Sequence, residues 1–522
     1  MKKRKEGFSF FALGAVKIMA FVLMLILSAG ALLVTSYNDE AFIVRYAENN
    51  VFLGMGAALL YFMICSAVVV FAQRKVKKRD KCLLVVVLGW IAVVGACLIV
   101  FGRSVPTADA MSVYSIAESL ALGDTSVIHP TDSYLSYYPH QIGLVAFLEP
   151  LFRIWGFLGI EQHAYHFIKG IYVVLLCLSV YFNYKTVDML WENSAVNTFF
   201  LCIAASNAPM IVYSSFIYGE VPAYAAFSLG MYCLLCFAKK KKFCAEAFLS
   251  ILFLAFSVML RKNSLILIIA VCLCLACEGI RQDKKIFLGI AVLCAAGAVS
   301  ILPFVQRCYE KRAENTLSSG VTALSYIAMG MQEGYGACGF YNGFNFDTYQ
   351  QSGLNAELAN EISREAIRER LAYFKENPGY ACSFYAQKHL AQWADASYDS
   401  LFVTSSNYGG RSAFFHSMYD GELKECYVVY CKIFQIAVFT SAFLYCVIQW
   451  KKKENYGFLE YIGLVAVLGG FLFHIMWEGS SRYVYIYSLL LMPYAACGMN
   501  SIAEKCRNLI NCKKVLDREG KV

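Results

Sequence analysis

The stretch that decides the fold is QRKVKKRDKCLLVVVLGWIAVVGACLIVF, residues 73–101, in which a basic block runs directly into an uninterrupted apolar segment. About 20 apolar residues in a helix span the hydrocarbon core of a bilayer, where unpaired backbone groups are not tolerated. Residues 82–101 therefore predict a transmembrane helix. The Lys and Arg residues before it mark its cytoplasmic end, because basic residues are enriched on that side.

The same pattern recurs along the chain. Of its 522 residues, 59% are hydrophobic and 16% are charged, which is more apolar surface than one soluble core can bury. The first run, Phe10 to Val34, is too long for a signal peptide and has no clear cleavage site, so we interpret it as a retained span. We predict an all-α polytopic membrane protein with about twelve spans, at 10–36, 51–73, 82–101, 164–185, 195–213, 221–238, 243–260, 264–280, 286–304, 429–449, 457–474 and 483–499.

The net charge of +9 comes from short basic blocks between apolar runs rather than from one basic surface. These blocks are MKKRKE at the start, residues 73–81, KKKK at 239–242, RQDKK at 281–285 and KKK at 451–453. This distribution follows the positive-inside rule and argues against nucleic acid as a partner. It predicts a multi-pass protein of the cell membrane with both termini in the cytoplasm.

One apolar stretch, Ile142 to Ile160, does not fit this topology as a span, because every later basic block would then face outward. We expect a re-entrant or juxtamembrane helix on the outer side. The other interpretation is that a different weak segment fails to span. Two outer regions remain, a loop at 102–163 and a segment at 305–428 that is rich in Tyr and Phe and has a helical pattern over Asn355 to Glu376.

These regions predict four parts of the chain. Residues 1–81 hold two additional N-terminal spans, and residues 82–304 form a transmembrane core that includes the outer loop 102–163. Residues 305–428 fold as a small extracytoplasmic cap, and residues 429–522 hold the last spans and a cytoplasmic tail. We find no internal repeat, nucleotide-binding loop, HExxH motif, zinc-type cysteine pairing or nucleophile elbow.

Two outer stretches carry groups suited to catalysis. The first loop contains PTADA at 106–110, Gly123-Asp124 and YLSYYPHQIG at 134–143. The stretch YSSFIYGEVP at 213–222 lies between two spans and contains a second carboxylate, Glu220, two residues before Pro222.

This ordered set resembles the GT-C class of membrane glycosyltransferases, especially protein O-mannosyltransferases and the aminoarabinose transferases of lipid A. The resemblance covers most of 82–305 and equates Asp109 with the acidic residue of the family's first outer loop. Family members have a second carboxylate at the position of Glu220, usually Asp, so Glu220 departs from the pattern by one methylene. Residues 10–73 have no counterpart in the simplest members.

Sugar transfer to a hydroxyl requires a carboxylate to accept or orient the acceptor proton. We assign this role to Asp109. We expect Glu220 to orient the acceptor, to share the proton or, together with Asp109, to hold a divalent ion such as Mg²⁺ or Mn²⁺. The alternatives are that Asp109 is a helix N-cap and that Glu220 is an ordinary interfacial acid before a helix that starts with proline.

Cationic groups are needed for the departing phosphate. Arg261 and Lys262 lie between two apolar runs at the outer edge, against the positive-inside bias, and family members carry Lys or Arg at this turn to meet the lipid phosphate. Arg482 is a second candidate for phosphate binding, tethered by Glu478. The alternatives are snorkelling of the basic pair to lipid headgroups and an ordinary helical ion pair between Glu478 and Arg482.

Other residues are candidates for lining the substrate path: Tyr138, His140, Tyr218, Trp477 and Glu478. In the cap, the stretches Gly339 to Asn345 and Gln392 to Asp395 combine aromatic rings with amides, which suits sugar binding as well as ordinary turns and core packing.

The sequence therefore predicts a glycosyltransferase that moves a sugar from a polyprenyl-phosphate donor of undecaprenyl type to a hydroxyl of a glycan, lipid or protein outside the cytoplasm. Its partners are this donor, the acceptor and membrane lipids. Two other classes remain open, an O-antigen-type polymerase and a flippase for lipid-linked glycans. A polymerase would depend on the outer arginines more than on Asp109, and a flippase would favour inverted repeats.

Overall fold

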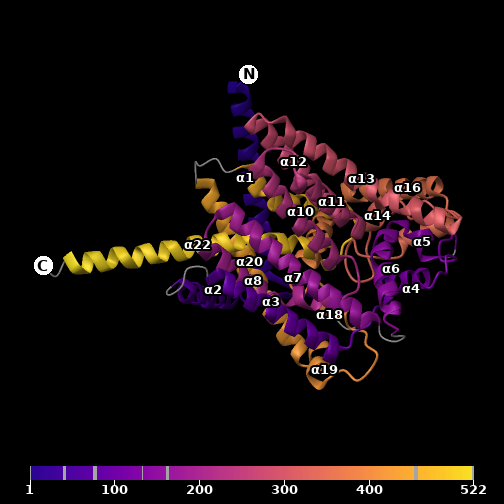
Figure 1. Cartoon of the computed structure of the whole chain (residues 1–522), viewed down its shortest axis with the longest axis horizontal. Helices are drawn as coiled ribbons and strands as arrows, with labels where there is room; N and C mark the ends of the chain where they lie inside the picture. Colours follow the sequence, from indigo (N-terminus) through magenta and orange to yellow (C-terminus); the bar gives the residue numbers. More distant parts are fainter. Residues whose placement is uncertain are drawn as a thin grey trace.

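The computed structural model describes residues 2–38, 43–73, 79–131, 133–159, 164–451 and 457–519. These residues form a bundle of helices. Helices α4, α6, α14 and α16 gather at one end, and the C-terminal helix α22 extends from the other end (Figure 1). The basic blocks at 73–81 and 451–453 fall largely outside the described residues.

Within the described ranges, ten helical segments are long and apolar enough to cross a membrane, which confirms the predicted all-α polytopic membrane fold. They belong to α1 (Lys2–Leu33), α2 (Val51–Gln73), α3 (Arg79–Cys97) with its π-helical extension η1 (Leu98–Gly102), α7 (Ala164–Trp191), α10 (Glu220–Lys240), α12 (Ser264–Gln282), α13 (Lys285–Ala313), α20 (Leu423–Lys451), η4 (Phe458–Tyr461) with α21 (Ile462–Met476), and α22 (Ser481–Glu519).

Two of the twelve predicted spans differ from simple membrane helices. The predicted span 195–213 is bent by 61° between α8 (Ser194–Ser206) and the pair α9 (Ala208–Val212) and η3 (Tyr213–Ser215). Asn207 leaves helical geometry there and its side chain accepts a hydrogen bond from Met210 N at 3.1 Å. The other, α11 (Ala245–Leu260), has 16 residues, so it is roughly 24 Å long, shorter than the hydrocarbon core. The count is therefore ten, or eleven with the bent pair.

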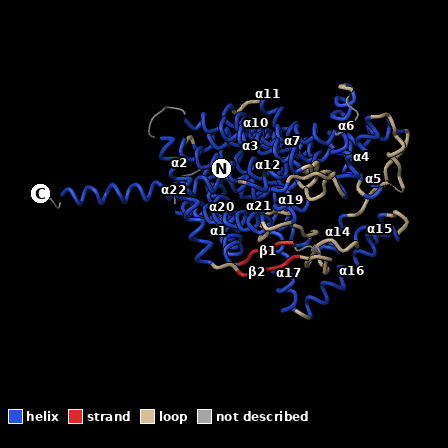
Figure 2. The backbone as a smooth tube through the Cα atoms, turned by 90° about the horizontal axis from the view of Figure 1, so that it is seen from below, coloured by secondary structure: helices blue, strands red, loops and turns tan. Residues whose placement is uncertain are grey.

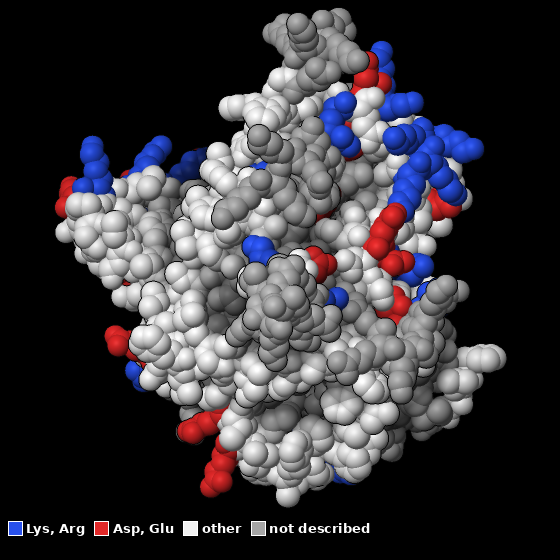
Figure 3. Space-filling view, turned by 90° about the vertical axis from the view of Figure 1, so that its left-hand side faces the viewer, with Lys and Arg blue, Asp and Glu red and all other residues white. Residues whose placement is uncertain are grey.

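The directions of the helices show at which end of the bundle each connecting loop lies. Because α10 and α11 run in opposite directions, Glu220 at the start of α10 meets Arg261 after the end of α11. We call the end that carries these two residues the site end. The turns after α10 and α12, with KKKK at 239–242 and RQDKK at 281–285, lie at the opposite end. The face away from α4, α6 and α14 shows Lys and Arg side chains mainly in its upper part, with broad uncharged areas elsewhere (Figure 3).

The apolar stretch that does not fit the predicted topology as a span, Ile142 to Ile160, forms α6 (Ile142–Phe157). This helix is not among the candidate spans. Its first turn packs on the end of α11, where a Cβ on Gly143 would lie 2.1 Å from Met259 O. In its middle, Glu149 accepts a hydrogen bond from Arg312 Nη1 at 2.6 Å, near the end of α13. Both contacts hold α6 at the site end, beside α4 (Ala108–Ala121), α5 (Tyr134–Tyr137) and η2 (Pro139–Gln141), as expected for a helix that stays on one face.

The region 305–428, which we predict to be a cap and call the cap below, contains the end of α13, the start of α20 and between them helices α14 (Ala323–Gly330), α15 (Phe344–Gln351), α16 (Ala356–Glu376), α17 (Pro378–Trp393), α18 (Ser400–Val403) and α19 (Ala413–Asp420). The expected helix over 355–376 is confirmed as α16. Asn355 is its N-cap, and its side chain accepts hydrogen bonds from the amides of Glu357 and Leu358 at 2.9 and 3.2 Å.

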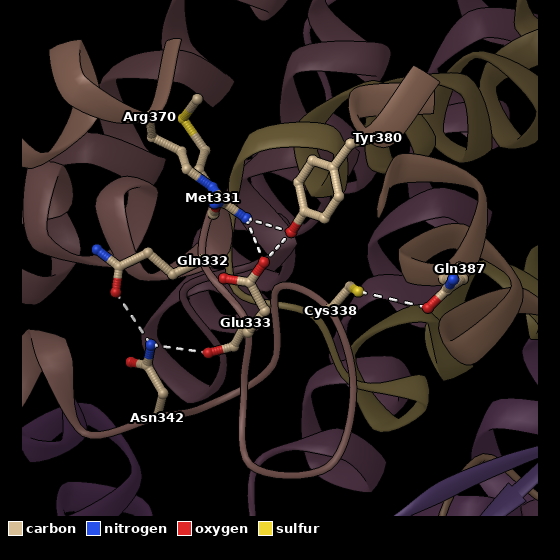
Figure 4. A network of polar contacts seen from close by, with 8 residues as sticks. All are labelled: Met331, Gln332, Glu333, Cys338, Asn342, Arg370, Tyr380 and Gln387. Carbon is tan, nitrogen blue, oxygen red and sulfur yellow. Dashed lines mark hydrogen bonds and ion pairs between the residues drawn. The ribbon is translucent and has the colours of Figure 1, made fainter. Parts of the chain in front are cut away.

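A loop at 331–343 projects from the cap and is held closed by polar contacts (Figure 4). Arg370 donates to Met331 O at 2.5 Å and to Glu333 Oε1 at 2.7 Å, and Tyr380 also donates to Glu333. Asn342 donates to Glu333 O at 3.1 Å, which closes the loop on itself. This network fixes the loop that carries Tyr335, Phe340 and Tyr341.

The N-terminal segment also reaches the cap. The apolar run from Phe10 remains helical only to Leu33, because β1 (Val34–Asn38) then pairs antiparallel with β2 (Val44–Glu48). Ser36 Oγ donates to Leu390 O in α17 at 2.8 Å, and Val44 N donates to Gly336 O at 3.0 Å. Figure 2 shows the two strands beside α1 and α17. The hairpin is therefore in direct contact with the cap.

Candidate functional site

A buried ion pair links two candidate site residues that are 41 positions apart in the sequence. Arg261 Nη2 lies 3.0 Å from Glu220 Oε1, with side-chain exposures of 15% and 6%. A Cβ on Gly219 would lie 2.4 Å from Leu260 O, so glycine is what lets the start of α10 approach the end of α11 this closely. Neither oxygen of Glu220 accepts a hydrogen bond of good geometry. The carboxylate is therefore neutralised by charge but keeps acceptor capacity.

Tyr218 lies at the centre of the charged groups. Its ring faces the guanidinium groups of Arg261 at 5.1 Å and Arg482 at 5.7 Å, and its hydroxyl accepts a hydrogen bond from Gln141 Nε2. The pKa of Tyr218 is raised to about 12, first by burial and then by the negative charge of Asp109. The two guanidinium groups oppose this shift. Two of the three predicted cations and the predicted acid Asp109 thus act on one phenol.

Asp109 lies half-buried in the first turn of α4, where the helix dipole favours a carboxylate. Thr107 is the N-cap of this helix, so the N-cap interpretation of Asp109 is wrong. The pKa of Tyr138, a second candidate residue, is raised first by burial and then by the charge of Asp109. Asp109 makes no ion pair with Arg261 within the described ranges. Its oxygens are therefore available to a ligand.

Side chains from the helix bundle and from the cap donate hydrogen bonds to the backbone that precedes Asp109. The buried Lys169 Nζ donates to Ser104 O at 2.9 Å, and Arg411 Nε donates to Gly102 O at 2.9 Å. Ala108 has φ of 46°, in the left-handed region that side chains with a Cβ rarely adopt. Such a conformation costs on the order of 1–3 kcal/mol and persists where its surroundings enforce it. These contacts fix the direction in which Asp109 leaves the loop.

His140 and Lys262 belong to the same region. The pKa of His140 is lowered to about 3, first by burial and then by the positive charges of Lys262 and Arg261. The imidazole is therefore uncharged at neutral pH. Burial also lowers the pKa of Lys262. A positively charged neighbourhood of this kind attracts an anion.

Arg482 has no carboxylate partner among the described residues, and its guanidinium lies over the rings of Phe216, Tyr218 and Tyr483 at 5.9, 5.7 and 5.2 Å. The interpretation of Glu478 and Arg482 as an ordinary helical ion pair is therefore wrong. The reason is that α22 begins only at Ser481, so the two residues are not on one helix.

Lys388, which sequence reasoning missed, ties the cap to the turn that carries Glu478. Its buried ammonium donates to Gly330 O, Ile475 O and Trp477 O at 2.5, 3.0 and 2.7 Å. Burial lowers its pKa to about 7. The backbone carbonyls at the end of α21 thus accept hydrogen bonds from a cation, and the helix dipole favours a positive charge at a helix C-terminus.

The ring of Trp477 lies at the edge of the site. It stacks on Tyr326 and Phe473 at 5.0 and 4.9 Å. Among the described residues, Trp477 contacts neither Asp109 nor the arginines, and its stacking partners connect the cap to α21 instead. Of the ten predicted site residues, Trp477 is thus the one that borders the charged centre rather than belonging to it.

Glu478 gives a pH-dependent prediction. It is 8% exposed, and its pKa is raised to about 7, mainly by burial, while Arg482 opposes the shift. The folded protein then holds this proton more tightly than the unfolded chain, so the stabilisation is present below about pH 4.5 and is lost as pH rises through 7. We expect Glu478→Gln to be more stable than the wild type by roughly 3 kcal/mol at pH 8, with little difference at pH 4.5.

Thermal unfolding midpoints of the wild type and Glu478→Gln between pH 4.5 and 8 measure this effect. Glu369→Gln, at an exposed position of α16, is the matched control and is expected to show no such trend. A difference between wild type and Glu478→Gln that stays constant over this range would contradict the assignment.

Asp109 and Glu220 do not fit the predicted divalent-ion site. Glu220 is already neutralised by Arg261, and a divalent ion prefers several oxygen ligands from more than one carboxylate. Within the described residues, no group of three or more His, Cys, Asp or Glu side chains could hold a metal ion.

Two further residues at the site were not predicted from the sequence, Asp399 and Asn38. Asn38 Nδ2 donates to Asp399 Oδ1 at 2.5 Å across 361 residues. Ser480 Oγ, from the turn that carries Glu478, donates to Asp399 Oδ2 at 3.2 Å. No local motif marks either residue, and only the tertiary structure brings them together.

No protein family profile and no curated protein sequence matches this chain. Among solved structures, it is similar to the archaeal oligosaccharyltransferase AglB from Archaeoglobus fulgidus, determined in complex with an inhibitory peptide and a dolichol-phosphate. The TM-score is 0.42 with 11% identity, over 84% of this chain and 52% of the other. This chain thus spans about half the length of that transferase.

Proposed function

We propose that this chain is a membrane glycosyltransferase of the GT-C type, which moves a sugar from a polyprenyl-phosphate donor to a hydroxyl group. The observation that carries the proposal is the arrangement around Tyr218, whose ring lies 5.1 Å from the Arg261 guanidinium and 5.7 Å from the Arg482 guanidinium, and whose pKa is raised by the negative charge of Asp109. A carboxylate opposite two guanidinium groups supplies both halves of such a transfer. The acceptor is a hydroxyl of a cell-envelope glycan, a lipid or a protein.

In the proposed reaction, the acceptor oxygen forms a bond to the anomeric carbon while the bond from that carbon to the phosphate oxygen breaks. The hydroxyl proton passes to Asp109, and the polyprenyl phosphate leaves as an anion. Arg482 and Arg261, with Lys262 nearby, stabilise the negative charge that develops on the phosphate. Attack from the face opposite the phosphate inverts the configuration of the anomeric carbon. Glu220 keeps Arg261 in place for this role.

An apolar groove supports a lipid-linked donor. It has a volume of about 610 Å³ and is lined by α1, α12 and α21. One end includes Ile266, one turn after Lys262, and Phe473, which stacks on Trp477. The other end includes Cys277, so the groove follows α12 for roughly 16 Å. We assign it to the isoprenoid chain of the donor, because it leads from the basic turn into the apolar part of the bundle.

The distribution of basic residues supports a site outside the cytoplasm. KKKK at 239–242 and RQDKK at 281–285 follow the helices that start at the site end, so they lie at the opposite end. The positive-inside rule assigns that opposite end to the cytoplasm. The site would then face the extracytoplasmic side, where polyprenyl-phosphate sugars act as donors without a cytosolic nucleotide sugar.

A transfer assay tests the proposal. Purified full-length protein in proteoliposomes is incubated with radiolabelled polyprenyl-phosphate sugars and acceptor membranes from cells that lack the protein, with and without EDTA. We expect label to move from the lipid to the acceptor fraction and polyprenyl phosphate to be released. Absence of transfer from every such donor, together with absence of polyprenyl-phosphate binding, would contradict the proposed function.

A further inference from the structure

A separate cavity lies beside Arg482, between the loop 331–343, α18 and the turn that joins α21 to α22. Its volume is about 310 Å³, which is at the lower end of the range for ligand sites. This size suits a ligand of one ring. The cavity does not include Asp109, Glu220 or Arg261, so it adds a second compartment to the site already described. Its walls include Asn38, Tyr335, Phe340, Tyr341, Asp399, Phe402, Glu478, Ser480, Arg482 and Tyr483.

Two buried carboxyl groups face this cavity and keep acceptor capacity. Glu478 is 8% exposed and accepts one hydrogen bond on Oε1, from Tyr483 at 3.1 Å, while its second oxygen has no partner among the described residues. Asp399 is 7% exposed and accepts from Asn38 and Ser480, one on each oxygen. A carboxylate offers about four acceptor positions. Both groups can therefore accept from the hydroxyls of a ligand.

The position of Asp399 is enforced by its surroundings. Tyr398 and Asp399 are consecutive residues with φ of 51° and 57°, both in the left-handed region. Tyr213 donates to Tyr398 O at 2.5 Å, and Asp395 Oδ2 accepts from Asp399 N at 3.1 Å and from Ser481 at 2.6 Å. Strained backbone that is held in this way is typical of functional sites. Here it turns the Asp399 carboxyl toward Asn38 and the cavity.

The remaining walls are aromatic. Tyr341 and Tyr335 lie edge to face at 6.1 Å and are carried by the loop that Arg370 and Glu333 hold closed (Figure 4). Apolar rings with a few convergent polar groups favour a ligand that has both an apolar face and hydroxyls. A ligand that carries its own carboxylate would meet Asp399 and Glu478 while the phosphate occupies Arg482, and bringing like charges together is unfavourable.

We propose that this cavity binds one uncharged, hydroxylated sugar ring, which packs on Tyr341 and donates hydrogen bonds to Asp399 and Glu478. Asn38, from the N-terminal hairpin, is a positioning residue for Asp399. The inference rests on the proposed function, because Arg482 is shared and would bind the phosphate next to the ring. The sugar is either the one carried by the lipid phosphate or a ring of the acceptor.

Binding measurements on the full-length protein in nanodiscs test this. The probes are bare undecaprenyl phosphate, undecaprenyl phosphates that carry glucose, galactose or mannose, the glucuronic acid counterpart, and the soluble methyl glycosides of the three hexoses. We expect at least one neutral hexosyl lipid to bind about tenfold more tightly than the bare lipid, equivalent to one or two net hydrogen bonds. The glucuronosyl lipid is expected to show no such gain.

Variants test whether the tighter binding of the hexosyl lipid depends on this cavity. Asp399→Asn and Tyr341→Ala are expected to abolish the hexosyl preference and leave affinity for the bare lipid unchanged. Tyr341 is 44% exposed, so its replacement does not threaten folding. Asn38→Ala is expected to reduce the same preference by weakening the hold on Asp399, a change in the affinity ratio that a purely structural role would not produce. Glu369→Gln is the control.

The binding results distinguish a donor sugar from an acceptor ring and from the absence of a sugar site. Loss of the hexosyl preference in the variants identifies the donor sugar as the ligand. Weakened binding of a methyl glycoside alone identifies the acceptor ring, and the cavity is still a sugar site. Equal affinities of the wild type for bare, hexosyl and glucuronosyl lipids, with no glycoside affected by Asp399→Asn, overturn the inference. That result leaves the proposed function standing, because the proposed function fails only if no polyprenyl-phosphate donor supports transfer and bare undecaprenyl phosphate does not bind.

Discussion

Replacement of Asp109 by asparagine is expected to lower the rate of sugar transfer by about 10²–10⁴-fold, the usual contribution of a general base. Asparagine has nearly the same shape and keeps the first turn of α4, but it cannot accept the acceptor proton. Because Asp109 forms no ion pair with Arg261, affinity for bare polyprenyl phosphate is expected to change little. Initial rates and lipid affinities of the wild type and Asp109→Asn measure the two effects separately.

The matched control is Asp124→Asn, at an exposed position in the same outer loop. It should transfer sugar at the wild-type rate. The same experiment separates the proposed transferase from an O-antigen-type polymerase, which would depend on arginines. Activity that survives Asp109→Asn and disappears in Arg482→Ala would favour the polymerase and contradict the role of Asp109.

Replacement of Arg261 by methionine is expected to produce the largest loss of stability. The change leaves Glu220 as a buried carboxylate without its cation, and breaking a buried pair in this way costs about 3–5 kcal/mol. The same variant should lose most of its affinity for polyprenyl phosphate, because one of the two guanidinium groups near Tyr218 is gone. Thermal unfolding midpoints and lipid binding report the two losses.

A double variant separates stability from ligand binding. Glu220→Gln combined with Arg261→Met removes both charges, and replacing both members of a buried pair is often close to neutral. We expect the unfolding midpoint to recover most of the loss while polyprenyl-phosphate binding stays weak. Wild-type lipid affinity in the double variant would show that Arg261 serves only to neutralise Glu220.

The sequence predicts those features that depend on local patterns. Apolar length identifies the spans, and the basic pair at Arg261 and Lys262, which interrupts two apolar runs, predicts an anionic partner. The structure adds Glu220 as the ion-pair partner of Arg261, which the sequence did not predict. The alternation of apolar and charged residues over 355–376 identifies α16. These signals are periodic or compositional, so they are visible without a three-dimensional structure.

Other features depend on contacts between distant segments. Asn38 reaches Asp399 because β1 crosses to the cap, and nothing around either residue marks that meeting. Lys388 looks like any lysine on a polar helix, yet its three carbonyl partners come from the cap and from the end of α21. The break at Asn207 does have a local signal, an asparagine two residues before proline, but the surrounding apolar run conceals it.

The claim on which the account depends is that Asp109, Arg261 and Arg482 face one bound phosphate. An experimental structure of the full-length protein with polyprenyl phosphate in nanodiscs measures this directly. The account predicts phosphate density within hydrogen-bonding distance of Arg482 or Arg261, on the side that Asp109 faces, with the isoprenoid chain between α1, α12 and α21. Phosphate density elsewhere on the protein, with these three residues away from any ligand, would contradict it.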